Sequence, residues 1–170
     1  MTKCVEMHDL MTGVNACVSP AITHDFDAVI GNPPWVRLSR IPLHQRHSLR
    51  ARYRTMSAAS APAASATGAR AFGAQPDLCV AFVERGLELV RPGCAVSYVV
   101  PSKLFRAGYA GPLRAFLRRE HTLVRAEDLS TDGAAFFRAD VFPARLTVLR
   151  GRPASGVGAP RVAVRSDGRR

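Results

Sequence analysis

One short segment of the chain carries groups that could do chemistry on an amine. An apolar stretch at residues 26–30 is followed by the tetrapeptide Asn32-Pro33-Pro34-Trp35. Asn32 offers an amide oxygen and Pro33 a backbone carbonyl, and the adjacent prolines restrict how the backbone can present them. Two such acceptors can hold both hydrogens of an exocyclic amine, so that its nitrogen pyramidalises and becomes a better nucleophile. Because Trp35 can stack on the ring that bears the amine, the segment predicts a base-binding site.

The rest of the pattern predicts the elements that position this segment. Strands are expected at residues 3–9, 26–30, 94–100, 122–127 and 141–149, and helices at residues 78–90 and 112–119. Asp77 is expected to cap the first of these helices. The alternation predicts an α/β fold with parallel strands flanked by helices, and ligands bind such sheets where the strands end.

The positive charge of the chain is concentrated near the tetrapeptide. The 170 residues carry a net charge of +11, and residues 28–76 contain seven arginines and no acidic residue. Residues 37–76 are therefore predicted to form a basic, flexible loop that contacts a polyanion. The alternative is a solvated loop in an arginine-rich chain. The nucleic-acid contacts that we expect are Arg37, Arg40, Arg46, Arg50, Arg52 and Arg54.

Other features of the composition argue against several classes of protein. No apolar run is long enough to span a membrane, and the N-terminus has no apolar stretch typical of a secretion signal, so a cytoplasmic location is expected. The four cysteines are widely spaced and are expected to be reduced core thiols. His44 and His47 are interpreted as solvated loop residues, and no metal site is expected.

At this point the sequence resembles a known family, the N6-adenine-specific, S-adenosylmethionine-dependent DNA methyltransferases of restriction-modification systems. The tetrapeptide matches the catalytic motif of that family. Residues 77–87, followed by Pro92-Gly93 and by Val99-Val100-Pro101, are similar to its next helix and strand, and Val141-Phe142-Pro143 is similar to a later segment. The similar segments extend from about residue 5 to residue 150.

The resemblance implies roles for individual residues. It implies that Asn32, Pro33 and Pro34 form the catalytic turn, and that Trp35 and Phe142 stack on a flipped-out adenine. Asp9 is implied to hold the adenine of the methyl donor, S-adenosylmethionine. DNA is the implied partner.

One element of the family pattern is missing from the chain. The resemblance calls for a glycine-rich turn of the form F-x-G-x-G that receives the donor, and the sequence contains none. We therefore expect residues 1–150 to form a partial catalytic domain, the C-terminal half of a Rossmann-like class I methyltransferase sheet, followed by a basic tail at residues 151–170. An N-terminally truncated gene remnant, one piece of a split enzyme whose other chain carries the missing half, and a mis-assigned start codon all fit this pattern.

Two alternatives to adenine methylation are compatible with the same residues. Families that methylate glutamine in proteins or guanine in ribosomal RNA share the Asn-Pro-Pro-aromatic turn. A non-catalytic fragment that binds nucleic acid through charge alone is the second alternative. The acid-free basic stretch and the segment around Phe142 favour DNA.

Overall fold

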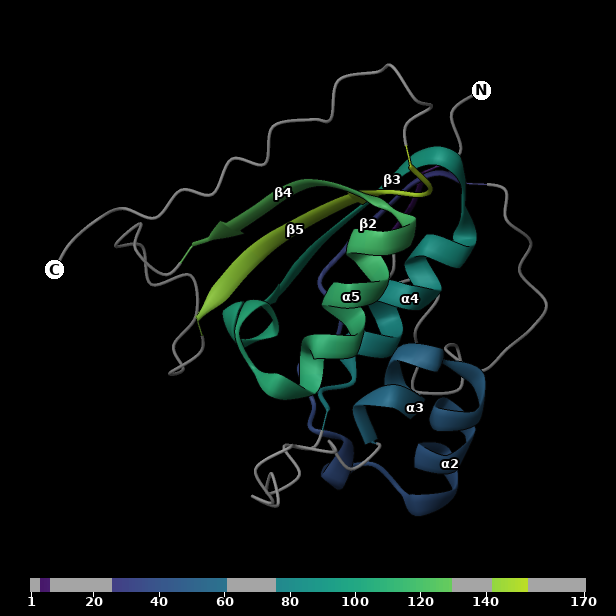
Figure 1. Cartoon of the computed structure of the whole chain (residues 1–170), viewed down its shortest axis with the longest axis vertical. Coiled ribbons are helices and arrows are strands. Elements are labelled where there is room, and N and C mark those ends of the chain that lie inside the picture. Colours follow the sequence, from purple (N-terminus) through teal and green to yellow (C-terminus); the bar gives the residue numbers. More distant parts are fainter. Residues whose placement is uncertain (1–3, 7–25, 61–75, 130–141, 153–170) are drawn as a thin grey trace, which may run out of the picture.

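The computed structural model describes residues 4–6, 26–60, 76–129 and 142–152. Five strands form one sheet in the order β1-β2-β3-β5-β4 (Figure 1). The strands are β1 (Cys4–Glu6), β2 (Phe26–Gly31), β3 (Val90–Pro101), β4 (Thr122–Asp128) and β5 (Pro143–Leu149). The helices are α2 (Leu43–Arg52), α3 (Arg54–Ser60), α4 (Cys79–Leu89) and α5 (Gly111–Glu120), with 3-10 turns η1 (Leu38–Arg40), η2 (Ser102–Phe105) and η3 (Gly108–Ala110).

The sheet is mixed. β1, β2 and β3 are parallel, whereas β5 runs antiparallel to both of its neighbours, β3 and β4. The predicted α/β class is confirmed, but the expectation that all strands are parallel is wrong for residues 143–149. An antiparallel neighbour needs no crossover helix, and strand periodicity does not reveal direction.

The boundary between α4 and β3 also differs from the prediction. The helix ends at Leu89, and the strand begins at once with Val90, four residues earlier than expected. Val90 pairs with Phe26 of β2, and the register then shifts before Ala28. Gly93 has a φ of 81°, a conformation that favours glycine, so the strand accommodates the Pro92-Gly93 pair as an irregularity.

The prediction of a flexible loop at residues 37–76 is wrong for its first part. Residues 38–60 contain η1, α2 and α3, and several of their apolar side chains are buried in the main core, whereas Leu43 is exposed. Leu49, Tyr53 and Met56 are 0% exposed and follow helical spacing. The abundant arginines hid this pattern, because only one side of each helix needs to be apolar. Residues 61–75 lie outside the described part.

Helices α4 and α5 lie on one face of the sheet, and α3 packs against both of them, with α2 packed against α3 (Figure 1). On that face Val29, Val96 and Leu146 are buried in the core with the helices. Ile30, the neighbour of Val29 on the same strand, points to the opposite face and is 50% exposed. Its cross-strand neighbour Ser97 is only half-buried, as is Thr147, whose hydroxyl lies 3.0 Å from that of Ser97. The second face therefore carries no described helix.

A buried carboxylate ties α3 to α4. Glu84 of α4 is 6% exposed and accepts hydrogen bonds from the backbone N–H groups of Arg54, at 3.2 Å, and Thr55, at 3.0 Å. The Thr55 hydroxyl donates a third bond at 2.5 Å. These N–H groups belong to the first turn of α3, which has no partner for them within the helix. Glu84 thus caps α3 from a neighbouring helix and places an anion at the positive end of its dipole.

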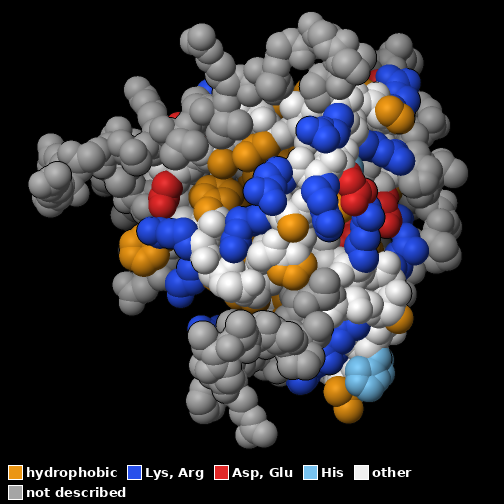
Figure 2. All heavy atoms as spheres, viewed as in Figure 1, with side chains coloured by type: hydrophobic (Ala, Val, Ile, Leu, Met, Phe, Trp, Pro, Cys, Tyr) orange, Lys and Arg blue, Asp and Glu red, His pale blue; other side chains and the backbone are white. Residues whose placement is uncertain are grey.

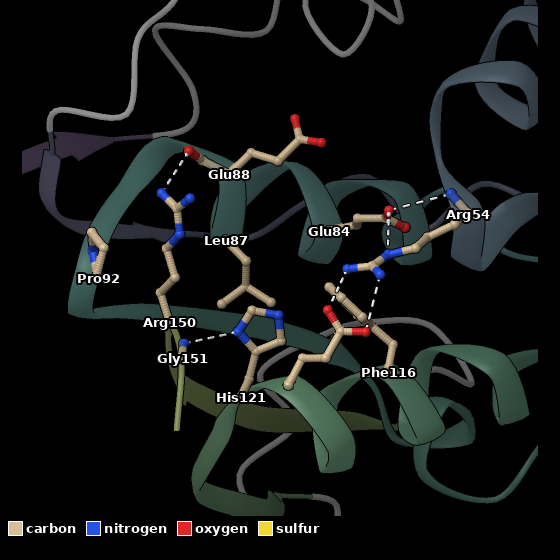
Figure 3. A pocket seen from close by; sticks show the side chains of 10 residues that line it. Arg54, Glu84, Leu87, Glu88, Pro92, Phe116, His121, Arg150 and Gly151 are labelled. Carbon is tan, nitrogen blue, oxygen red and sulfur yellow. Dashed lines mark hydrogen bonds and ion pairs between the residues drawn. The ribbon is translucent and has the colours of Figure 1, made fainter. Parts of the chain in front are cut away.

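Three helix ends meet around a cavity of about 400 Å³ at the amino end of the parallel strands (Figure 3). Arg150 donates to the carbonyls of Glu88, in the last turn of α4, and of Val90, the first residue of β3. His121 follows α5, and its Nδ1 accepts a bond from the Gly151 N–H at 3.1 Å. Because Nδ1 is the acceptor, the neutral ring carries its proton on Nε2, which is buried with no hydrogen-bond partner.

We predict that Glu84→Ala destabilises the chain by about 2–4 kcal/mol, because three donors lose their acceptor in a buried place. Glu84→Gln keeps one oxygen and should lose clearly less. Urea unfolding followed by circular dichroism measures both. Equal and small losses for the two variants would contradict the capping role.

The pH dependence of stability gives a second prediction. Burial lowers the pKa of His121 below its ordinary value of 6.5; Glu120 opposes this, while Arg54 and Arg150 lower it further. As the pH falls, His121 is therefore protonated in the unfolded chain before it is protonated in the folded chain. Above pH 6.5 it does not affect the free energy of unfolding. Between pH 6.5 and the lower pKa of the folded chain, the free energy of unfolding decreases as the pH falls. We expect His121→Gln to flatten this part of the urea-midpoint profile between pH 7 and 5. A profile identical to that of the unmodified chain would contradict the assignment.

Candidate active site at the carboxyl edge of the sheet

The Asn32 turn begins where β2 stops pairing. The last residue of β2 in register with β3 is Gly31, opposite Tyr98. Pro33 and Pro34 have no N–H group, so they cannot extend the ladder. Asn32 is exposed at this edge and Pro33 is buried beneath it. The turn therefore presents the Asn32 amide outward from a fixed base.

Trp35 is anchored to the neighbouring strand. Its indole Nε1–H donates to the carbonyl of Val99 at 3.4 Å. Val99 is the first residue of β3 beyond the last β2 pair, so the indole supplies a donor where the prolines cannot. The side chain is half-buried and is not sealed in the interior. This position leaves the ring held at the edge of the sheet beside the exposed Asn32.

The exit from the turn is clamped by a second backbone pairing. The N–H of Leu78 donates to the carbonyl of Val36 at 2.8 Å, and the N–H of Leu38 donates to that of Pro76 at 2.9 Å. Between them Arg37 and Asp77 form an antiparallel bridge. The tetrapeptide is therefore held by β2 on one side and by the start of α4 on the other.

Asp77 has the expected role at the helix start. Its carboxylate accepts a hydrogen bond from the Cys79 N–H at 3.1 Å. Burial raises the pKa of Asp77, while the bonds from Cys79 and the charge of Arg37 lower it. The Cys79 thiol is buried, which raises its pKa well above the usual range. Cys79 is a buried free thiol, as expected, whereas the free thiol Cys94 is only half-buried; Cys17 and the side chain of Cys4 lie outside the described part.

Phe142 lies at the same edge of the sheet. The Ser102 N–H, just after the end of β3, donates to the Phe142 carbonyl at 2.8 Å, and Pro101 pairs with Pro143. The Phe142 side chain is 55% exposed, so its ring is accessible at this edge. The fold thus brings Asn32, Trp35 and Phe142 to one edge from distant parts of the chain. Asp9 lies outside the described residues.

The six arginines singled out from the sequence have different surroundings. Arg46 donates to the carbonyls of Ile41 and Ser39, and Arg52 forms an ion pair with Glu88. Arg54 makes two hydrogen bonds to Glu120, at 3.0 and 2.6 Å, and lies over the Phe116 ring. These three guanidinium groups hold helices together. Arg37 and Arg40 are exposed next to the turn, whereas Arg50 has a buried Nε without a hydrogen-bond partner.

Two basic residues at this edge were not singled out by the sequence analysis. Lys103 and Arg106 are exposed on and just after η2, which follows β3 directly. Their position directly after a strand that stops at Pro101 is the sequence signal that could have identified them.

The residues that the structure describes contain neither a cluster of metal ligands nor a membrane-spanning helix. No cluster of His, Cys, Asp and Glu in the described part could hold a metal ion. His44 and His47 are exposed on α2, where Figure 2 shows histidine side chains at the surface. None of the described helices is long and apolar enough to cross a membrane.

Comparison with known proteins places this geometry in a family. Residues 6–136 match the model of the Eco57I restriction-modification methylase family. The chain is 31% identical over 144 residues to the type II methyltransferase M.XhoI of Xanthomonas vasicola, covering 85% of the chain and 23% of that protein. It is 30% identical over 143 residues to M.PaeR7I of Pseudomonas aeruginosa, covering 82% of the chain and 21% of that protein. The chain thus spans less than a quarter of these relatives.

Solved structures agree on the fold. A Listeria monocytogenes protein assigned as a class I S-adenosylmethionine-dependent methyltransferase superposes with a TM-score of 0.60 at 13% identity, over 88% of this chain and 39% of that one. A protein of Vibrio vulnificus assigned as a modification subunit of a type I restriction enzyme gives 0.56 at 15% identity, over 88% and 31%. Since the family model covers most of its length, this chain belongs to the Eco57I restriction-modification methylase family.

Proposed function

We propose that this chain carries the base-binding part of a DNA methyltransferase that modifies the N6 amine of adenine. The observation that carries the proposal is the exposed Asn32 amide on a turn held from both sides. The exposed Phe142 at the same edge supports it, because a flipped-out base needs an aromatic surface to replace its stacking partners.

The chain's own groups would prepare the amine for reaction. The Asn32 side-chain oxygen and the Pro33 carbonyl accept one hydrogen each from the N6 amine. This draws the nitrogen lone pair out of conjugation with the ring. Trp35, fixed through Val99, and Phe142 hold the plane of the base. Because the acceptors are held before the base arrives, little reorganisation is needed when the amine binds.

The family and fold imply S-adenosylmethionine as the methyl donor, which supplies an electrophilic methyl group when bound. The described residues do not fit it. The cavity in Figure 3 lies at the opposite end of the strands from Asn32, and its charged side chains are already engaged: Arg54 pairs with Glu84 and Glu120, and Arg150 donates to backbone carbonyls. The chain also lacks the glycine-rich turn, and Asp9 lies outside the described part. We therefore assign only the base side of the reaction to these residues.

DNA is the acceptor that the observations favour. Arg37 and Arg40 are exposed directly after the turn, and no described acidic side chain forms an ion pair with either of them. Exposed arginines at such a place suit a phosphate backbone. A protein glutamine would need neither these cations nor the aromatic group at Phe142. Ribosomal RNA remains the competitor, which a direct comparison of acceptors separates.

We further propose that another part of a longer protein, or a separate chain, covers the second face of the sheet. The crossovers from β2 to β3 and from β3 to β4 step in the same direction, so right-handed connections put their helices on one face. A right-handed connection that steps the other way, beyond β1, would place its helix on the opposite face. Parallel strands are normally covered on both faces, and Ile30 is half exposed here. The M.XhoI and M.PaeR7I relatives have the length to provide such a segment.

The proposed chemistry is tested with Asn32→Ala in the protein extended to carry a glycine-rich donor turn. We expect transfer of labelled methyl groups to adenine in DNA to fall by about 10²–10³-fold, because one of two fixed acceptors is lost. DNA binding should stay within about threefold. Undiminished transfer would refute the role of Asn32, and a preference for ribosomal RNA or peptide over DNA would refute the substrate.

The proposed cover over the second face of the sheet is tested by substituting two neighbouring residues of β2, one on each face. Ile30→Ser should change the urea midpoint of this chain little, because the side chain is already half exposed, but should destabilise the longer protein by about 1–3 kcal/mol. Val29→Ser, on the helix-covered face, should destabilise both. Equal effects of Ile30→Ser in the two contexts would contradict the proposed cover.

A further inference from the structure

The turn that follows β3 is a rigid platform for two cations. Arg114 of α5 donates through one nitrogen to the carbonyls of Leu104 and Ala107, at 3.0 and 2.8 Å. The N–H groups of Arg106 and Ala107 both donate to the Lys103 carbonyl. With its backbone held in this way, the turn directs the Lys103 and Arg106 side chains outward, where both residues are exposed.

This platform adjoins the proposed base site. The Ser102 N–H is bonded to the Phe142 carbonyl, so Lys103 follows directly on the residue that touches Phe142. Pro101 lies three residues beyond Tyr98, the last partner of β2, which is about 10 Å along a strand. We name Lys103, Arg106 and Phe142 the basic-aromatic corner. The corner lies at the same edge of the sheet as Asn32, but towards β5 and away from β2.

The pairing of charges sets this corner apart. Asp27, Glu84, Glu88 and Glu120 are engaged by arginines away from the edge, whereas Glu127 and Asp128 lie at the carboxyl end of β4, where Glu127 lies near Arg125 and Arg145. Figure 2 shows acidic and basic side chains side by side on the helix-covered face. No described acid forms an ion pair with Lys103, and Arg106 reaches Asp128 only at 3.8 Å with its side chain 78% exposed. Both cations thus remain accessible to an external anion.

We propose that the basic-aromatic corner binds the backbone phosphates of the DNA strand that carries the target base. This inference rests on the proposed function. A base that leaves the duplex stays attached to its own sugar and phosphates, so a surface that stacks the base must also accommodate that charge. Proteins that bind unpaired strands combine cations that contact the backbone phosphates with aromatic rings that stack on the bases, and this corner offers both. The corner therefore supplies phosphate contacts that Arg52 and Arg54, engaged with Glu88 and Glu120, do not provide.

The test compares two double variants that remove the same charge. Lys103→Gln/Arg106→Gln removes the cations of the corner. Arg118→Gln/Arg119→Gln removes two exposed cations at the other end of α5, near the amino end of the strands. The probe is a labelled duplex oligonucleotide with one mismatched adenine, and anisotropy gives its affinity for this chain between 50 and 200 mM salt. Circular dichroism verifies folding, and Lys103→Gln alone serves if the double variant does not fold.

We expect the corner variant to bind about tenfold or more weakly and to reduce the slope of log affinity against log salt by about 2. The α5 variant should change affinity by less than about threefold. Equal losses in the two variants would overturn the assignment, as would a larger loss on single-stranded RNA than on DNA.

The outcome is separable from that of the proposed function. Asn32→Ala removes no charge and should leave the salt slope unchanged while abolishing methyl transfer in the extended protein. If Asn32→Ala keeps full transfer while the corner variant loses binding, the phosphate contact stands and the catalytic proposal fails. If Asn32→Ala abolishes transfer and the corner variant binds normally, only the inference on Lys103 and Arg106 fails.

Discussion

The geometry of this edge depends on two consecutive residues that cannot donate a hydrogen bond. Pro33 and Pro34 end the pairing of β2 with β3 and leave the next β3 carbonyl without a backbone donor. The Trp35 indole takes that acceptor, and the backbone beyond it pairs with residues 76–78. Because both sides of the turn are tied to the sheet and to α4, the exposed Asn32 stands on a stiff support. The Asn32 side chain therefore faces solvent from a turn whose backbone is held on both sides.

The distribution of arginines follows from the burial of a single carboxylate. Glu84 caps α3, and this brings Arg54 over Phe116 and within reach of Glu120. A buried acid with three donors fixes the orientation of α3 against α4, so the basic segment packs as helices instead of tracking a ligand. Cations near the turn and near η2 lie outside this network. Some arginines of this basic chain therefore hold helices together, while others remain exposed.

Sequence patterns predict individual helices, strands and turns better than they predict the direction of a strand or the tertiary contacts of a side chain. The helix around Phe82 and Leu87, the strand at Val96 and the turn at Asn32 could all be predicted, because periodicity and proline report on neighbouring residues. The antiparallel direction of β5 could not, since it depends on which strands lie beside it. The burial of Tyr53 and Met56 was missed among charged neighbours. Asn32, Trp35 and Phe142 lie at one edge of the sheet. Arg37 is exposed whereas Arg54 is paired with Glu84 and Glu120, and this difference depends on the tertiary structure, which no local pattern shows.

The place of β5 between β3 and β4 has a consequence for how the protein matures. Phe142 reaches the edge only when β5 inserts between two strands that precede it in the chain. Its contact with Ser102 spans some forty residues, and Asn32 lies more than a hundred residues before it. Such non-local pairings close late in folding, because loop entropy must be overcome first. A nascent chain that has already formed the Asn32 turn therefore gains Phe142 at the same edge only after β5 has been synthesised and inserted.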